Sequence, residues 1–469
     1  MDILELGALE LSSALERRDV SAREVMQATL DRIAAVNGTV NAIVSLRDSD
    51  QLLAEAEAAD AAPRGGWMHG MPIAIKDLAN AAGFPTSQGS PIFAGQMAVQ
   101  DDLPVARIRA AGAIVIGKTN TPEFGLGSHT YNPVHGATTN PYDPARSSGG
   151  SSGGAAAALA TRMLAVADGS DMMGSLRNPA GWNNVYGMRP GWGSVPGEPA
   201  GDVFLHQLAT AGPMARSPAD LAALLDTMAG ADPRLPLSQD QAATLPQMAE
   251  ALPPQRIAWL GDWDGALPFE DGLLDLSAEA VAQLGNLGHE ITPLAAPFNA
   301  NAIWDSWITL RSFAVAGGAR ALHENPDTRA MLKPAAIWEI ERGLALSAMQ
   351  VQQASEVRSD WFRAAVALFD SFDVLVLPSA QIWPFDVTLD YPREIAGITM
   401  DTYHRWMQVV IPASLLGLPV VNIPAGFGQN GLPAGLQLIG PRGSDARLLQ
   451  LAQQWHEATR WPQQRPPAI

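Results

Sequence analysis

Residues 147–180 read SSGGSSGGAAAALATRMLAVADGSDMMGSLRNPA. The first eight residues have the composition of a flexible linker, but the alanine-rich run that follows them is a strong helix former. A glycine-rich turn that opens a helix gathers backbone N–H groups and lets a substrate approach the chain closely. Further on, Ser175 follows a glycine on a turn after the apolar residues 163–167. This is the position of a nucleophile, although many surface turns have the same composition.

A lysine ends an apolar run upstream of this stretch. Residues 70–77 read GMPIAIKD, in which residues 73–75 predict a buried strand and Lys76 follows at its end. A lysine at such a place can simply extend along the strand end to water. Only three of the 30 basic residues are lysines, however: Lys76, Lys118 and Lys333. Because arginine is never deprotonated in proteins, a retained lysine is a weak sign of a position where arginine cannot serve.

Helical and apolar segments alternate along the chain. The first 36 residues predict helix, with a capping box of Ser21 and Glu24 and a stop at Asn37-Gly38. Further helices are predicted near 103–111, at 155–163 and from Ser217 to about 229. Strands are predicted at 73–75, 113–116, 257–260, 374–377, 420–423 and 436–439. This alternation indicates an α/β fold around one sheet.

The expected organisation is a single domain over residues 1–469. Between about 230 and 370 the chain becomes mostly helical and acidic, with proline and glycine at the joins. We interpret this interval as an elaboration that shapes the substrate pocket, and not as an independent domain.

The composition excludes several classes of protein. The net charge of −18 opposes binding to nucleic acids and to anionic membranes. The absence of cysteine excludes disulfides, thiolate metal sites and a cysteine nucleophile. The N-terminal residues are acidic where a signal peptide would be basic, and no apolar run has membrane-spanning length, so we expect a cytoplasmic protein. The eight histidines lack metal-ligand spacing, and we expect neither metal nor cofactor.

Together these motifs resemble the amidase signature family. The glycine- and serine-rich core of that family matches residues 149–179, and Ser175 lies 24 residues after Ser151, which lies 75 after Lys76. Further similarity runs from the N-terminal helix through residues 117–124 and resumes at 431–440. The resemblance covers most of the chain and is weakest between 230 and 370. It implies the amidase signature fold, with a central mixed β-sheet and helices on both faces.

The resemblance also assigns roles to residues. Ser175 would attack a carbonyl carbon, and Ser151, on a cis peptide bond, would relay the proton to a neutral Lys76. Serine–lysine pairs are a known variant of triad chemistry, in which a base activates a poor hydroxyl nucleophile. For this, the pKa of Lys76 must fall toward roughly 7–8, as desolvation allows. The oxyanion would be bound by the backbone N–H groups of Met172, Met173, Gly174 and Ser175.

The turn before Ser175 departs from the family pattern. Most relatives have Thr-Gly-Gly there, whereas this chain has Met172-Met173-Gly174. The backbone donors survive this change, so the reaction class stands, but the shape of the acyl pocket does not follow. Asp171 and Arg177 match the charged residues of the motif, and we expect them to brace the loop.

Aromatic residues near expected strand ends are candidates for a substrate pocket. Most tryptophans of a globular protein belong to its core. Aromatic residues beside proline-rich loops could form the wall of an aromatic substrate pocket, and residues of other loops could line the active-site cleft. The candidates are His129, Tyr131, Trp383, Tyr403 and Trp406.

Two other functions compete with a free-standing amidohydrolase. Residues 112–119 match the P-loop pattern GxxxxGK[ST], which would indicate an NTPase, but their apolar letters read as strand and not as a phosphate-binding loop. The second is the amidotransferase subunit that releases ammonia from glutamine for a tRNA-bound partner. The acidic charge and the motif departures favour a hydrolase of small-molecule amides, as a monomer or homodimer. Esters, anilides and carbamates (urethanes) suit the same chemistry, and the sequence does not rank them.

Overall fold

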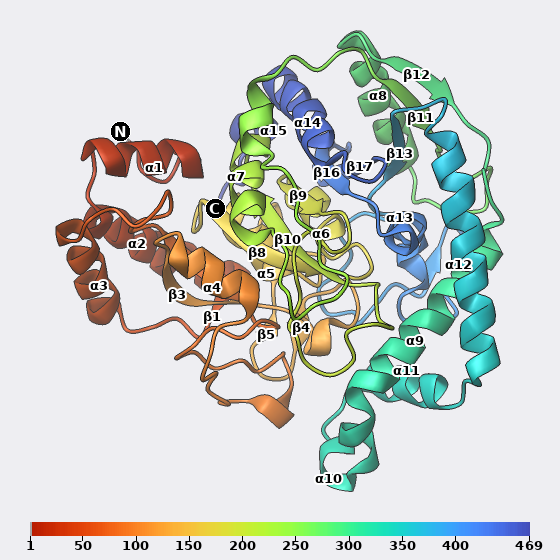
Figure 1. The fold of residues 1–469 in the computed structure, drawn as a ribbon, viewed down its shortest axis with the longest axis horizontal. Helices are drawn as coiled ribbons and strands as arrows, with labels where there is room; N and C mark the ends of the chain where they lie inside the picture. The colour runs from red at the N-terminus through yellow and green to blue at the C-terminus, as the bar shows by residue number, and fades with distance from the viewer. Residues whose placement is uncertain (1) are drawn as a thin grey trace.

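A mixed eight-stranded sheet forms the centre of the computed structural model, which describes residues 2–469 (Figure 1). Strand β11 is parallel to β12 and β13, and every other neighbouring pair is antiparallel. The order across the sheet is β12 (Glu290–Pro293), β11 (Arg256–Trp259), β13 (Val374–Pro378), β17 (Pro433–Ile439), β16 (Val420–Phe427), β9 (Tyr186–Arg189), β10 (Thr210–Ala215) and β8 (Val166–Asp171).

Alternating side chains of the sheet enter two separate cores. Val374 and Val376 of β13 pack with α7 (Pro218–Met228), α8 (Leu273–Asn286) and α14 (Asp445–Thr459). Leu375 and Leu377 point to the other face, because successive strand residues alternate in direction. There they pack with α9 (Ala300–Glu324), α12 (Ala348–Leu368) and α13 (Ile411–Leu416). The predicted α/β fold, with a central mixed sheet and helices on both faces, is confirmed.

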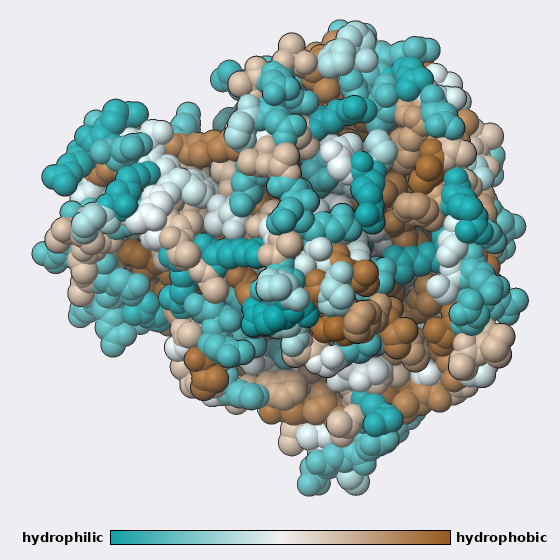
Figure 2. Space-filling view, in the orientation of Figure 1, coloured by the Kyte–Doolittle hydropathy of each residue, from teal (hydrophilic) through white to brown (hydrophobic). Residues whose placement is uncertain are grey.

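A smaller sheet lies in the N-terminal part of the chain. Its order is β1 (Ile43–Val44), β3 (Ile114–Thr119) and β2 (Pro72–Lys76). Around it lie α1 (Ala8–Arg17), α2 (Ala22–Val40), α3 (Ser49–Ala61) and α4 (Leu103–Ala110) (Figure 1). In Figure 2 the exposed surface of α1 to α3 is mainly hydrophilic, whereas hydrophobic residues gather where α9, α11 (Pro334–Leu344) and α12 meet the body of the molecule.

In place of the single N-terminal helix that the sequence predicts, the structure has two helices, α1 and the longer α2. Arg18 has a φ of 59° and ends α1, and the capping box of Ser21 and Glu24 opens α2 as expected. The stop expected at Asn37-Gly38 falls two residues later, at Val40. A glycine is tolerated inside a helix at a cost of about 1 kcal/mol. The side chain of Asn37 instead binds the segment after the helix, accepting from the N–H groups of Ala42 and Ile43.

The interval 230–370 is mostly helical, as expected, and includes α8 to α12, of which α10 spans Pro326–Arg329. It also supplies β11 and β12, so one edge of the central sheet is built from it. That this interval is an elaboration of a single domain stays a prediction. Within residues 2–469, no helix is both long and apolar enough to cross a membrane.

The shorter elements complete the chain. These are α5 (Gly153–Ala160), α6 (Asn178–Trp182), α15 (Trp461–Gln464), β4 (Tyr131–Asn132), β5 (Gly136–Ala137), β6 (Thr139–Asn140), β7 (Asp143–Ser147), β14 (Glu394–Ile395) and β15 (Ile398–Thr399). Strands β9 and β10 had no counterpart among the predicted strands; both contain glycine, which weakens a strand pattern.

Candidate active site

Lys76 is buried at the end of β2, with 1% of its surface exposed. Its Nζ lies 2.8 Å from the Oγ of Ser151 and 2.8 Å from the Oγ of Ser152. It also reaches the Oγ of Ser170 at 3.1 Å and its carbonyl oxygen at 3.3 Å. Burial lowers the pKa of Lys76 to about 7, against an opposing effect of Asp168 and Asp171. Near neutral pH the amine is therefore available in its unprotonated form.

Ser151 lies on the glycine-rich turn that opens α5, as the sequence predicted. The peptide bond between Gly150 and Ser151 is cis. The glycines of this turn allow a close backbone approach: a Cβ on Gly154 would lie 2.3 Å from the backbone nitrogen of Asn120. Small residues are therefore required where α5 passes the end of β3, and this packing holds Ser151 against Lys76.

Ser175 lies on the turn after β8 and is 6% exposed. Gly174, just before it, has a φ of +79°, and a Cβ there would lie 2.8 Å from the side chain of Val410. Only glycine suits this position. Among the residues that the structure describes, no hydrogen bond joins the Ser175 hydroxyl to Ser151 or to Lys76. In enzymes without bound substrate such contacts are often long and tighten in the complex.

Asp171 braces the turn that carries Ser175. Its carboxylate accepts from the N–H groups of Gly174 at 2.9 Å and Leu176 at 3.0 Å, and from Arg177 Nε at 3.0 Å. Burial alone would raise the pKa of Asp171, but the guanidinium groups of Arg177 and Arg189 outweigh it and hold that pKa well below its ordinary value. The carboxylate therefore stays ionised and fixes the loop.

The backbone donors expected for the oxyanion are not equivalent in the structure. The N–H of Gly174 is already directed at the Asp171 carboxylate. The N–H groups of Met172, Met173 and Ser175 have no partner among the described residues. These three are the donors left free to bind an oxyanion.

Asp168 is a buried acid beside Lys76 that the sequence reasoning did not assign to this site. It lies on β8, is 4% exposed, and accepts from the backbone N–H of Lys76 at 2.9 Å. Burial raises the pKa of Asp168 to about 6, although Lys118 and Lys76 oppose this. The signal in the sequence was an acid among apolar strand residues, three positions before Asp171.

Lys118 does not form a P-loop. It lies within strand β3, and its Nζ donates to the carbonyl of Ala79 and to the hydroxyl of Thr86. The same Nζ lies 3.8 Å from the carboxylate of Asp77. Residues 114–119 are strand, as the apolar letters indicated, so no phosphate-binding loop exists there. Over residues 2–469 no group of three or more acidic or histidine side chains is arranged to hold a metal ion.

Four of the five candidate pocket residues line one cavity of about 400 Å³: His129, Tyr131, Tyr403 and Trp406. Trp383 is not part of this lining, and its indole Nε1 donates to the carbonyl of Asp271. Proximity in sequence to a strand end does not decide to which side of the sheet a loop turns.

The cavity borders the segment that carries Ser151. Ser128, in its wall, donates to the carbonyl of Gly150. His129 is held by Ser147 and by the carbonyl of Val387, and burial lowers the pKa of His129 to about 4, so it is neutral. A smaller cavity of about 260 Å³ reaches Ser170, which contacts Lys76.

The interval 230–370 reaches the Ser175 loop through Arg311 on α9. Its Nη1 lies 3.5 Å from the sulfur of Met172, and its Nη2 donates to the hydroxyl of Tyr403 at 2.8 Å. The Nε lies 3.2 Å from Glu339, which also accepts from Tyr403. The methionine that departs from the family pattern is therefore packed against a buried ion pair. Nothing in the local sequence indicated this contact.

This fold and site define a class. The family profile named Amidase matches residues 24–449. An acylamidase of Rhodococcus erythropolis is 32% identical, covering 98% of this chain and 97% of that protein. A glutamyl-tRNA(Gln) amidotransferase subunit of Thermus thermophilus is 35% identical, covering 96% and 97%. A bacterial aryl acylamidase of the amidase signature family superposes with a TM-score of 0.91 at 26% identity, covering 99% of both chains. The chain belongs to the amidase signature family.

Proposed function

We propose that this protein is an amidohydrolase that cleaves small carboxylic amides through an acyl-enzyme on Ser175. The observation that carries this proposal is the buried contact of 2.8 Å between Lys76 Nζ and Ser151 Oγ, with a Lys76 pKa of about 7. A neutral amine so placed can accept a proton through Ser151 when the Ser175 hydroxyl attacks. The same proton then passes to the leaving amine, and water releases the acyl group in a second cycle.

The free donors support stabilisation of the tetrahedral intermediate. The N–H groups of Met172, Met173 and Ser175 would bind the oxyanion, while Gly174 keeps its bond to Asp171. The proposal therefore uses three of the four backbone donors that the sequence analysis expected. Loss of one preorganised oxyanion donor raises the barrier of such a reaction by about 3–4 kcal/mol.

The 400 Å³ cavity favours an aromatic part in the substrate. Tyr131, Tyr403 and Trp406 in its wall offer ring faces and edges to an aryl group. Aryl amides (anilides) are therefore the substrates that we propose first. Esters and carbamates present the same carbonyl with another leaving group, and we rank them after anilides.

The second candidate is a glutamine-dependent amidotransferase component, which is the function named for two relatives that are 33% and 35% identical to this chain. The test that separates the two is hydrolysis of 4-nitroacetanilide, benzamide, an aryl ester and an aryl carbamate by the purified chain alone. We expect turnover of the anilide without partner proteins. Activity on glutamine alone, or only after addition of partner proteins, would favour the amidotransferase.

The Ser175→Ala enzyme should be folded and inactive, because the acyl-enzyme cannot form. A fluorophosphonate should add to the wild-type enzyme at Ser175, detected by peptide mass spectrometry. Ser359→Ala serves as the control, because Ser359 is exposed on α12 and its hydroxyl donates only to the carbonyl of Ser355; this variant should still be labelled at Ser175. Adduct formation on another serine would contradict the assignment.

A further inference from the structure

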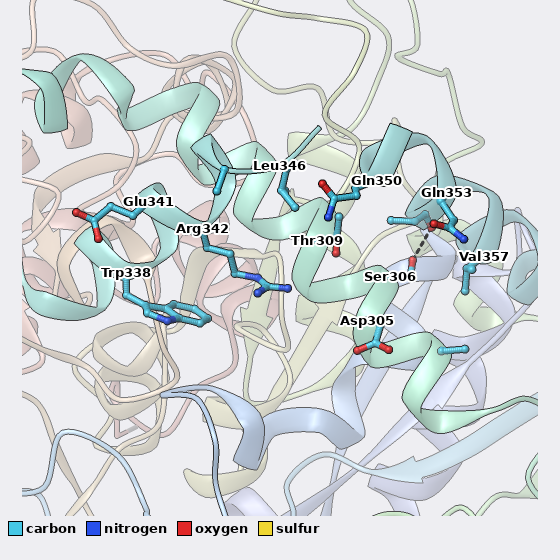
Figure 3. A pocket seen from close by; sticks show the side chains of 13 residues that line it. Asp305, Ser306, Thr309, Trp338, Glu341, Arg342, Leu346, Gln350, Gln353 and Val357 are labelled. Carbon is cyan, nitrogen blue, oxygen red and sulfur yellow. Dashed lines mark hydrogen bonds between the residues drawn. The ribbon is translucent and has the colours of Figure 1, made fainter. Parts of the chain in front are cut away.

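Helix α11 lines two cavities. One is the 400 Å³ cavity beside the Ser151 segment. The other encloses about 740 Å³ between α9, α11 and α12, and Figure 3 shows its lining. Trp338 belongs to both walls, and its ring lies 6.1 Å from that of Tyr403. The two cavities are therefore neighbours that share Trp338 in their walls.

The lining residues of α11 form one stripe. Ala335 and Trp338 face the smaller cavity, and Trp338, Arg342 and the residue that caps the helix, Ala345, face the larger one. Their spacings of three and four residues place them on one side of the helix. At 1.5 Å per residue the stripe is about 15 Å long. We name this continuous surface the α11 groove.

Arg342 is an unsatisfied donor in the groove. Within residues 2–469 its guanidinium has no hydrogen bond or ion pair, and its Nε is buried without a partner. The adjacent Glu341 is engaged with Arg329 at 2.8 Å. In Figure 3 the Arg342 guanidinium extends from α11 toward α9, on the side of Thr309 and Asp305. A buried donor left without an acceptor is destabilising, and an oxygen of a bound ligand would satisfy it.

The opposite wall supplies an acceptor. Asp305 on α9 lines the same cavity, yet it forms no ion pair with Arg342 in the described part of the chain. A donor and an acceptor across one cavity match the carbonyl oxygen and the N–H of an amide group. Gln350 and Gln353 add further amide donors and acceptors at the far end. The exposed ring of Trp338, between the two cavities, can pack against a planar spacer.

We propose that the α11 groove binds the distal part of elongated substrates that carry a second amide group beyond an aryl spacer. The scissile carbonyl lies at Ser175, the aryl spacer packs on Trp338, and the second amide bridges Arg342 and Asp305. This proposal rests on the amidohydrolase function proposed above, and it names the substrate class of that site.

The test compares short and extended anilides. The short substrate is 4-nitroacetanilide, and two extended substrates carry an acetamidophenyl group, one through the acyl part and one through the leaving amine. We expect the wild-type enzyme to prefer at least one extended substrate in kcat/KM. Arg342→Ala should lower the ratio of extended to short kcat/KM at least tenfold, mainly through KM, and Arg342→Lys should retain more of that ratio.

Arg320→Ala is the matched control. Arg320 lies on the same helical interval, in an exposed ion pair with Glu324, and it lines neither cavity. Its removal should leave the ratio unchanged. The proposal is overturned if the wild-type enzyme shows no preference for either extended substrate, or if Arg342→Ala leaves the ratio intact.

A binding measurement separates this proposal from the function of Ser175. Calorimetric titration of the Ser175→Ala protein with an extended bis-amide requires no turnover. If the Ser175→Ala/Arg342→Ala double variant binds the bis-amide at least tenfold more weakly, the result supports ligand binding in the α11 groove even if no anilide is hydrolysed. Equal affinity with and without Arg342 overturns the groove while leaving the hydrolase proposal in place.

Discussion

Asp168 accepts a hydrogen bond from the backbone N–H of Lys76 at 2.9 Å, where the end of β2 lies beside the middle of β8. The two side chains belong to one buried charge system, in which burial lowers the pKa of Lys76 and raises that of Asp168. The charge of the lysine is therefore adjusted by a carboxylate that takes no part in the proposed proton relay.

The arginine and alanine variants of Lys76 test whether the lysine acts as a base. Lys76→Arg keeps a positive charge but stays protonated at any working pH. Lys76→Ala removes both charge and base. We expect both variants to lose at least a hundredfold in kcat on 4-nitroacetanilide, with arginine no better than alanine. A tenfold loss in kcat corresponds to a barrier raised by about 1.4 kcal/mol. An arginine variant that loses less than this, and so keeps more than about a tenth of the wild-type kcat, would show that the lysine serves only as a charge.

Burial of Lys76 should also change stability with pH. The folded pKa of about 7 lies below the ordinary value of 10.5, so between these values the unfolded chain binds the extra proton. Stability therefore rises with pH across this window, and the penalty of the buried lysine is fully present below about pH 7. Lys76→Met removes the penalty. Relative to the wild type, we expect the free energy of unfolding of this variant to be larger, that is more stabilising, by a few kcal/mol at pH 6.5 than at pH 10.5.

Denaturant unfolding of both proteins at the two pH values measures this difference. Methionine also removes the donor for Ser151 and Ser152, but that loss is common to both pH values and cancels in the comparison. A wild-type minus variant difference that is independent of pH would mean that Lys76 keeps an ordinary pKa.

Asp168→Asn should move the pH dependence of the reaction. The ionised carboxylate raises the Lys76 pKa, against the larger effect of burial. Its removal lowers that pKa further, so the rise of kcat/KM should shift to lower pH. The pH profile of the variant on 4-nitroacetanilide gives the shift. Since a purely structural loss would lower the rate without moving the midpoint, an unmoved midpoint would contradict this role.

Local sequence determined the central part of the candidate site but not its surroundings. Ser151, Ser175 and Lys76 lie on strands and turns whose residue patterns are short-range, and the resemblance of those patterns to the amidase signature family singled the three residues out. The contact of Arg311 with Met172 joins residues 139 positions apart. It depends on how α9 packs on the sheet, and no periodicity encodes that. The position of Trp383 could not be predicted for the same reason, because the packing of its loop places it outside the cavity that Tyr403 lines.

In the fold as well, the elements set by local sequence could be predicted, and those set by packing could not. Long apolar strands such as β13 and β16 were predicted because each is buried on both faces. Strands β9 and β10 were missed because residues such as Gly187 and Gly212 interrupt the apolar pattern. Those glycines are required by close packing, since a Cβ on Gly187 would lie 2.0 Å from the carbonyl oxygen of Leu176. Such a requirement becomes visible only when the neighbouring chain is in place.

The buried pair of Arg311 and Glu339 gives the last prediction. Glu339 is fully buried and Arg311 is 2% exposed, so removal of one partner leaves an uncompensated charge in the interior. Arg311→Met should therefore lower the free energy of unfolding by about 3–5 kcal/mol. The double variant Arg311→Met/Glu339→Gln removes both charges and keeps one side-chain oxygen that can accept from Tyr403 or from Ser312. It should recover more than half of the loss, because replacing both members of a buried pair is often close to neutral.

The same variants separate stability from the shape of the site. The double variant still lacks the guanidinium that contacts the sulfur of Met172, so the Met172 side chain is released next to the free backbone donors. We expect its kcat on 4-nitroacetanilide to stay reduced although its stability recovers. Denaturant unfolding and steady-state kinetics on the same preparations give the two quantities. If kcat recovers together with stability, Arg311 supports the fold alone, and the contact with Met172 has no part in the reaction.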